Sequence, residues 1–297
     1  MITGVYSLYK TPARWQIFKT NPNIKNSVEY QIASWLKENA NGERVFLSGS
    51  TAFWLNEFAP DVWQVRGDID QASTNRFWDR ATYQIRNSPD PAETLSWLAA
   101  LRVNYVVVHD NNSREYYHDF KFPEKFENIG QKVFDNGQGD RIYQLDAKLA
   151  SVVSQKHLNE FSKETDKNEK AMLAEYAKWL KSGNLANLEK TRDGIKIKAD
   201  VKDGDVIALG ITHDKGWKAR SLQGDSVLAI KKDPFGNLVI LPNTSGSQEI
   251  YLSWKEGPDL WFGILISIVS FFFTIIILPR NFSKILQAVN KGWQENE

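Results

Sequence analysis

The sequence contains no cysteine, which excludes disulfides, thiolate zinc sites and cysteine nucleophiles. Net charge is also nearly absent: the formal charge is +1, and basic and acidic residues balance when the tail after Leu278 is left out. Proteins that bind nucleic acid carry a basic surface, so we exclude nucleic acid as a partner. The four histidines lack the spacing of a metal site, and no serine stands in a nucleophile elbow.

Cofactor motifs are missing as well. The stretch GSTAF at 49–53 lacks the Gly-Lys-Ser/Thr ending of a phosphate-binding loop. The sequence therefore predicts no cofactor and no bound metal.

The start of the chain lacks a targeting segment, because MITGVYSLYKTPARWQIF has no basic region followed by an apolar one. One long apolar run is present near the end, LWFGILISIVSFFFTIIIL at 260–278. About 20 such residues cross the hydrocarbon of a bilayer, and each Leu, Ile, Phe or Val favours insertion by roughly 0.3–0.6 kcal/mol. We predict a transmembrane helix at 260–279. A buried core helix is the alternative, but it would normally show a polar stripe.

The flanking charges predict the orientation of this helix. Basic residues follow the run, whereas the preceding side carries Glu256 and Asp259 with a single Lys255. The positive-inside rule then puts residues 1–259 outside the cytoplasm and the amphipathic tail 280–297 inside. Because no targeting segment precedes such a domain, either the orientation is reversed or the chain ends a longer polytopic protein; we favour the second.

The rest of the chain predicts an α+β fold. Residues 1–26 are an irregular N-terminal segment, and 27–150 form a small α/β layered domain. A helix begins at Ser27, with Val28, Ile32, Trp35 and Leu36 on one face, and another covers 91–101. A short buried strand is expected at 44–50, a continuous apolar strand at 104–110 and a further strand at 140–146.

From residue 151 onward the spacing of the apolar residues predicts first helices and then strands. Residues 151–190 predict a helical connector with Leu173, Tyr176 and Leu180 on one face. From 191 to 257 short strands with period two alternate with turns, which predicts a small antiparallel β-sandwich. We expect Trp217 to cap its core rather than to stack on a ligand.

A resemblance emerges in this β-rich region. The segments HDKGWKARSLQGDSVLAI and LVILPNTSGSQEIYLSW, followed by WFGILIS, resemble the C-terminal end of YfhO-like bacterial membrane proteins of the GT-C glycosyltransferase superfamily. The matching residues are Gly216, Trp217, Lys218 and Ala219, then Gly224, then Leu241, Pro242 and Gly246. Lys215 and Gln223 depart from the Pro and Asp of that pattern, and the turn after Pro242 is longer. The resemblance covers about residues 27–280.

The resemblance implies a polytopic glycosyltransferase of the bacterial plasma membrane whose catalytic acids lie in early extracytoplasmic loops absent from this chain. The chain would then assist binding of a glycan acceptor or a lipid-linked sugar, beside the lipid bilayer and the N-terminal transmembrane part of the same protein. The alternative is a membrane-anchored scaffold or interaction module of the bacterial envelope, without sugar chemistry.

The strongest candidate for a binding site is Ser50–Arg80, predicted as a long loop. Aromatic rings suit the C–H faces of sugars, and carboxylates, amides and Arg suit the hydroxyl edges. The glycan-binding candidates are Trp54, Asn56, Glu57, Trp63, Arg66, Asp68, Asp70, Gln71 and Trp78. The alternative is an aromatic-rich packed loop with solvated charges.

Two more specific hypotheses for this loop, a metal site and a glycosidase site, are disfavoured. Asp68-Ile69-Asp70 resembles the Asp-x-Asp metal motif, but GT-C enzymes use lipid-linked donors and need no nucleotide-bound cation. Glu57, Asp68, Asp70 and Asp79 offer paired carboxylates for a glycosidase, yet nothing in the sequence fixes their separation.

Overall fold

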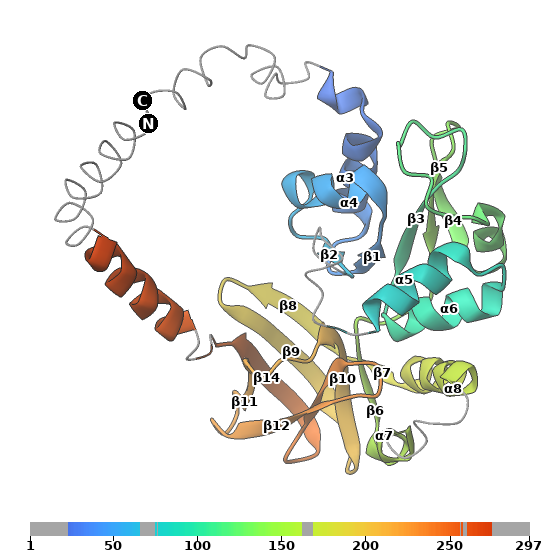
Figure 1. Ribbon diagram of the computed structural model, residues 1–297. Coiled ribbons are helices and arrows are strands. Elements are labelled where there is room, and N and C mark those ends of the chain that lie inside the picture. Colours follow the sequence, from blue (N-terminus) through green and yellow to red (C-terminus); the bar gives the residue numbers. More distant parts are fainter. Residues whose placement is uncertain are drawn as a thin grey trace, which may run out of the picture.

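The computed structural model describes residues 23–65, 75, 77–161, 169–255, 257 and 260–274. Over these residues the protein is a mixed α+β structure built on two sheets (Figure 1), as the sequence predicted. Most of the predicted irregular segment 1–26, and all of the tail 280–297, lie outside the described residues.

The first sheet has the strand order β2-β1-β3-β5-β4, with β2, β1 and β3 parallel and the remaining pairs antiparallel. Its strands are β1 (Arg44–Phe46), β2 (Trp63–Gln64), β3 (Tyr105–His109), β4 (Gln131–Asp135) and β5 (Asp140–Gln144). The strands predicted at 44–50, 104–110 and 140–146 correspond to β1, β3 and β5.

Helices cover both faces of this sheet. On one face lie α3 (Val28–Asn39) and α4 (Gly49–Phe58), and on the other α5 (Trp78–Asn87) and α6 (Pro91–Ala100). Strand β3 contributes alternate residues to the two cores, since Tyr105 and Val107 pack with α3 and α4 while Val106 and Val108 pack with α5 and α6. Two short 3-10 helices, η2 (Ile24–Asn26) and η4 (Pro123–Asn128), complete this part.

The predicted helix starts are confirmed by their caps. The Ser27 hydroxyl accepts a hydrogen bond from the Tyr30 N–H at 3.2 Å, at the start of α3. The Asp90 carboxylate accepts one from the Ala92 N–H at 2.9 Å, and Pro91 begins α6.

The second sheet has nine strands, and all its pairs are antiparallel, in the order β7-β6-β10-β13-β12-β11-β14-β9-β8. The strands are β6 (Ala150–Ser154), β7 (Asn184–Leu185), β8 (Asn187–Thr191), β9 (Gly194–Val201), β10 (Asp205–Thr212), β11 (Trp217–Ser221), β12 (Val227–Lys232), β13 (Asn237–Leu241) and β14 (Gly246–Trp254). The strands expected within 191–257 are therefore present, but they share one sheet with β6, β7 and β8.

Between β6 and β7 the chain forms α7 (Gln155–Phe161) and α8 (Glu169–Ser182). As predicted, Leu173, Tyr176 and Leu180 of α8 are buried together. The predicted connector 151–190 is thus helical only in its middle. Its first residues form β6 because the β-branched Val152 and Val153 pair with β10.

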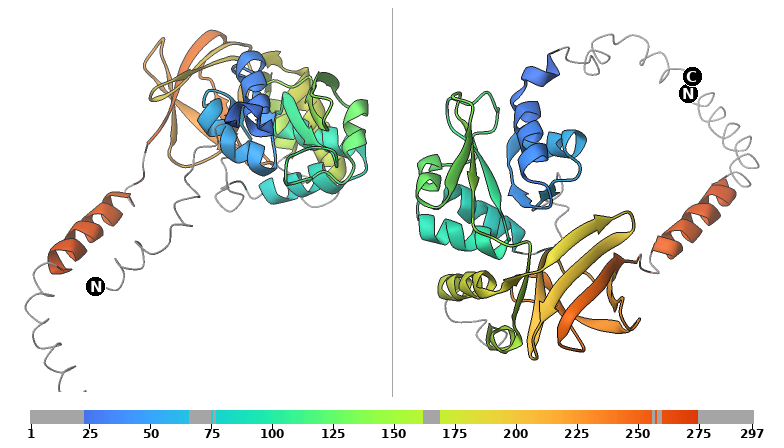
Figure 2. Two further views of the ribbon diagram at one scale, coloured as in Figure 1. Left: turned by 90° about the horizontal axis from the view of Figure 1, so that it is seen from above. Right: turned by 180° about the vertical axis from the view of Figure 1, so that it is seen from behind.

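Helix 260–274 follows β14 and lies apart from both sheets in Figures 1 and 2. Of the transmembrane helix predicted for 260–279, residues 275–279 lie outside the described part of the chain. Within the described residues, no helix combines the length and apolar character needed to cross a membrane.

Candidate functional site

The stretch Ser50–Arg80, predicted as a loop, contains α4, β2 and the start of α5. After β1 the chain turns at Gly49, whose φ of +68° lies in the left-handed region that favours glycine. Helix α4 was missed because two of its large aromatic residues, Phe53 and Trp54, lie on its exposed side and obscure the apolar face.

The exposed side of α4 carries Phe53, Trp54, Asn56 and Glu57, which we call the α4 surface. The Trp54 side chain is 45% exposed, and its ring stacks on Phe58 with 5.5 Å between centroids. The Asn56 Oδ1 accepts a hydrogen bond from Gln64 Nε2 at 2.8 Å. An exposed, supported ring beside an amide and a carboxylate is a combination that can contact both the C–H face and the hydroxyls of a sugar.

The other two tryptophans of the predicted site have packing roles. Trp63 is half-buried against the apolar core of the second sheet. Trp78 is only 3% exposed and packs on Phe46, so its assignment as a glycan-binding side chain is corrected to a core residue. The candidates Arg66, Asp68, Asp70 and Gln71 lie outside the described residues.

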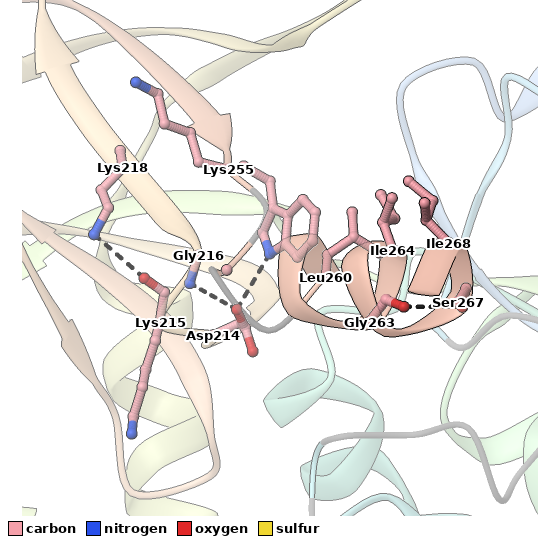
Figure 3. A pocket seen from close by; sticks show the side chains of 12 residues that line it. Asp214, Lys215, Gly216, Lys218, Lys255, Leu260, Gly263, Ile264, Ser267 and Ile268 are labelled. Atoms are coloured by element: carbon pink, nitrogen blue, oxygen red, sulfur yellow. Dashed lines mark hydrogen bonds between the residues drawn. The ribbon is translucent and has the colours of Figure 1, made fainter. Parts of the chain in front are cut away.

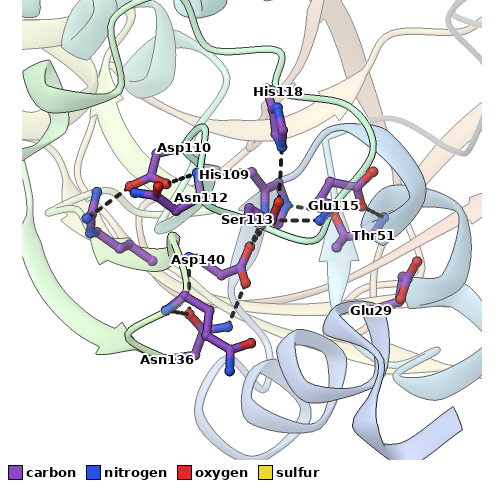
Figure 4. A network of polar contacts seen from close by, with 12 residues as sticks. Glu29, Thr51, His109, Asp110, Asn112, Ser113, Glu115, His118, Asn136 and Asp140 are labelled. Atoms are coloured by element: carbon purple, nitrogen blue, oxygen red, sulfur yellow. Dashed lines mark hydrogen bonds and ion pairs between the residues drawn. The ribbon is translucent and has the colours of Figure 1, made fainter. Parts of the chain in front are cut away.

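A buried polar network joins the first turn of α4 to β3 and β5 (Figure 4). The His109 Nδ1 lies 2.7 Å from Asp140 Oδ1, and its Nε2 lies 3.2 Å from Thr51 Oγ1. Ser113 and Asn136 also donate hydrogen bonds to the Asp140 carboxylate. Burial by itself raises the pKa of Asp140, but hydrogen bonds from His109, Ser113 and Asn136 outweigh it and hold the pKa below its usual range.

The side chains of Asp140, His109 and Thr51 contact one another in the order found in a hydrolase triad, with the histidine between the carboxylate and the hydroxyl. However, Thr51 is 1% exposed, and its hydroxyl donates to the Ser48 carbonyl at 2.7 Å. A buried hydroxyl that is already bonded does not reach a substrate, so we assign this network a structural role.

The N-terminus of α4 is satisfied by Glu115, which lies in the loop after β3 (Figure 4). Its carboxylate accepts hydrogen bonds from the backbone N–H groups of Ser50 at 3.1 Å and Thr51 at 3.3 Å, and from the Ser50 hydroxyl. Phosphates bind in this position in many strand–turn–helix units. Here the chain supplies its own anion.

The polar network could have been expected from one signal in the sequence. Polar residues that directly follow two adjacent parallel strands meet at one edge of the sheet.

A second candidate surface lies where β14 meets helix 260–274, and we call it the β14 junction (Figure 3). The Asp214 Oδ1 accepts hydrogen bonds from the Gly216 N–H at 2.7 Å and from Trp254 Nε1 at 3.2 Å. These two bonds lower the pKa of Asp214. A Cβ at Gly216 would lie 2.4 Å from Trp254 Nε1, so the Gly-Trp-Lys-Ala motif requires glycine for this close approach.

The β14 junction combines positive charge with an apolar helix. Lys215, Lys218 and Lys255 are exposed and line the same hollow as Leu260 and Ile264 (Figure 3). Large apolar side chains are exposed on every side of helix 260–274, including Trp261 at 66%. Trp217 of the motif packs half-buried against the core of the second sheet, as predicted for a cap.

Among the described residues, no group of three or more His, Asp or Glu side chains is arranged to hold a metal ion. No protein family, curated protein or solved structure matches this chain.

Proposed function

We propose that the chain is the extracytoplasmic C-terminal part of a polytopic GT-C-like membrane glycosyltransferase, and that it helps to bind a glycan acceptor or a lipid-linked sugar. One observation carries the proposal. Strand β14 leads within a few residues to helix 260–274, whose apolar side chains are exposed on every side. Exposed apolar area costs about 25 cal/mol per Å², so such a helix requires lipid or neighbouring apolar helices around it.

The β14 junction supports the same arrangement. Lysines at the head of an apolar helix can extend to lipid headgroups on either side of a membrane, and Trp254 and Trp261 suit the aromatic belt of a membrane interface. The basic residues after the apolar run favour a cytoplasmic C-terminus, which puts both sheets on the outer side.

The α4 surface is the part of this chain that we assign to glycan binding. The Trp54 ring would contact the C–H face of a sugar, while the Asn56 amide N–H would donate hydrogen bonds to its hydroxyls and the Glu57 carboxylate would accept hydrogen bonds from them. Glycosyl transfer itself is assigned to loops of the whole protein that this chain does not contain.

Trp54→Ala tests the glycan role. We expect binding of envelope glycans to weaken about threefold to tenfold, the loss of one aromatic contact. Tyr83→Ala removes a more exposed ring from α5, on the opposite face of the first sheet, and should leave binding unchanged. If the folded Trp54 variant binds glycans like the wild type, the α4 surface has no sugar role and the scaffold alternative is favoured.

The mass of the natural product tests the polytopic origin. An immunoblot of source cells, with antibodies against residues 27–190, should show a band far above the 34.0 kDa of this chain. A band at 34.0 kDa would contradict the proposal that preceding transmembrane helices belong to the same polypeptide.

A further inference from the structure

The end of the second sheet that leads into helix 260–274 is basic. The strand register defines this end, because Trp254, the last residue of β14, pairs with Trp217, the first residue of β11. Three exposed lysines surround it, namely Lys215, Lys218 and Lys255. Their side chains extend in different directions around the start of the helix (Figure 3). The positive charge therefore forms a surface rather than a single pocket.

Two more lysines lie at the same end. Strand β12 is antiparallel to β11, so its last residues lie toward the first residues of β11. These last residues are Lys231 and Lys232, and both are exposed. A hydrogen bond from the His213 N–H to the Gly236 carbonyl, at 2.9 Å, also joins the β10–β11 turn to the β12–β13 turn. We call the following five residues the basic end: Lys215, Lys218, Lys231, Lys232 and Lys255.

Acidic groups do not neutralise the basic end. Among the described residues, none of its lysines forms an ion pair. The Asp214 carboxylate already accepts the two hydrogen bonds described above, and Asp233 is buried. Even when Glu256 and Asp259, which follow β14 in the sequence, are counted, the lysines remain in the majority.

The opposite end of the same sheet has the opposite character. It contains the β9–β10 turn, because Val201 pairs with Gly246, the first residue of β14. The charged residues at this turn are Asp200, Lys202, Asp203 and Asp205. Acids are in excess here, so the second sheet has its positive end at the helix and a negative end away from it.

We propose that the basic end docks on anionic lipid headgroups and so holds the second sheet against the membrane surface. A lysine is a compact charge on a flexible stem, and five exposed lysines can each contact a different headgroup. The apolar side of the hollow, which includes Leu260, Ile264 and Ile268, continues from these lysines toward the acyl chains. The inference rests on the membrane helix of the proposed function, but not on the orientation of that helix or on glycan binding.

The lipid selectivity of the full chain tests this docking. The chain is reconstituted in nanodiscs made from an equal mixture of phosphatidylcholine and phosphatidylglycerol and is then extracted with a mild detergent. The lipids that stay bound are quantified by mass spectrometry. We expect phosphatidylglycerol to be enriched about twofold to fivefold over phosphatidylcholine at low salt, and the enrichment to fall as salt screens the exposed charges. Both leaflets contain the same lipids, so the result does not depend on which way the helix crosses.

Matched substitutions assign the enrichment to the basic end. At least about half of it should be lost when three exposed lysines are neutralised together, by Lys215→Gln, Lys218→Gln and Lys255→Gln. The control removes the same charge from exposed positions elsewhere, by Lys37→Gln, Lys156→Gln and Lys202→Gln, and should keep the enrichment. Arginine at positions 215, 218 and 255 keeps the charge and should also keep it. The basic residues after the apolar run attract the same lipids, but they are present in every variant.

Two kinds of failure are distinguishable. Equal retention of the two lipids by the wild type, or the same enrichment in the glutamine variant and its control, would overturn the docking and leave the membrane helix untouched. A chain that does not stay with the nanodiscs at all would contradict the membrane helix, and with it both the proposed function and this inference. Loss of enrichment in the arginine variant would show that charge is not its cause.

Discussion

The Arg44 guanidinium in β1 donates a hydrogen bond to the backbone carbonyl of Gly210 in β10 and so joins the two sheets. The same side chain donates to the carbonyls of Leu101 and Val65, each at 2.9 Å. Burial, followed by repulsion from Arg102, lowers the pKa of Arg44 to about 9. A single buried arginine thus satisfies three carbonyls from three separate segments.

Arg44→Met should destabilise the protein by about 3 kcal/mol, because the three carbonyls would be left buried without donors. Urea unfolding of the full chain in detergent measures the change. Lys37→Met, at an exposed position on α3, should stay within about 0.5 kcal/mol of the wild type. Equal effects of the two substitutions would show that Arg44 does not hold the sheets together.

Asp140→Asn should destabilise the protein by about 2–4 kcal/mol at pH 7, because it breaks the buried contact with His109. The folded-state pKa of Asp140 lies below its ordinary value of about 3.9. Its contribution is therefore present above that value and is lost as the pH falls through the folded-state pKa.

The difference in unfolding free energy between wild type and Asp140→Asn should accordingly shrink below about pH 4. Urea midpoints measured between pH 7 and the acid limit of folding give this difference. If it stays constant with pH, the Asp140 carboxylate is not stabilised by the network.

Glu115→Ala should cost about 1–2 kcal/mol, because the first N–H groups of α4 lose their acceptor. Added acetate should raise the unfolding midpoint of this variant more than that of the wild type or of Glu38→Ala, an exposed control on α3. Equal responses in all three proteins would argue against an anion site at this helix end.

Gly216→Ala should destabilise the β14 junction by about 1–3 kcal/mol, since its Cβ would lie 2.4 Å from Trp254 Nε1 and 2.7 Å from the Lys255 carbonyl. Gly224→Ala is the matched control, because an added Cβ there meets nothing within 4 Å. Trp fluorescence and urea midpoints report the change. Two equally stable variants would refute the close approach.

Local pattern was sufficient to predict much of the fold. The run NYVVVHD has the uninterrupted apolar centre YVVV because β3 is buried on both faces, and GIKIKADV alternates because β9 buries one face. The face of Leu173, Tyr176 and Leu180 followed from helical spacing alone.

Such local patterns could not predict the contacts between residues far apart in the sequence. Thr51, His109 and Asp140 come together only because β1, β3 and β5 are neighbours in one sheet, an order that periodicity does not specify. The burial of the Arg44 and Arg102 side chains follows from the docking of the two sheets, which sequence periodicity does not specify. The candidates Trp54, Asn56 and Glu57 were chosen by residue type and stay a prediction, while the burial of Trp78 depends on packing against Phe46 of β1.

Labelling of single added cysteines tests the membrane arrangement most directly, because these 297 residues contain none and the parent protein without the added cysteine measures any background label. In intact cells that make the full natural protein, a membrane-impermeant maleimide should modify Lys37→Cys, on the exposed side of α3. It should modify Ser283→Cys, beyond the apolar run, only after the cells are opened. The reverse pattern, or labelling of both positions from outside, would contradict an extracytoplasmic domain anchored by the helix that follows β14.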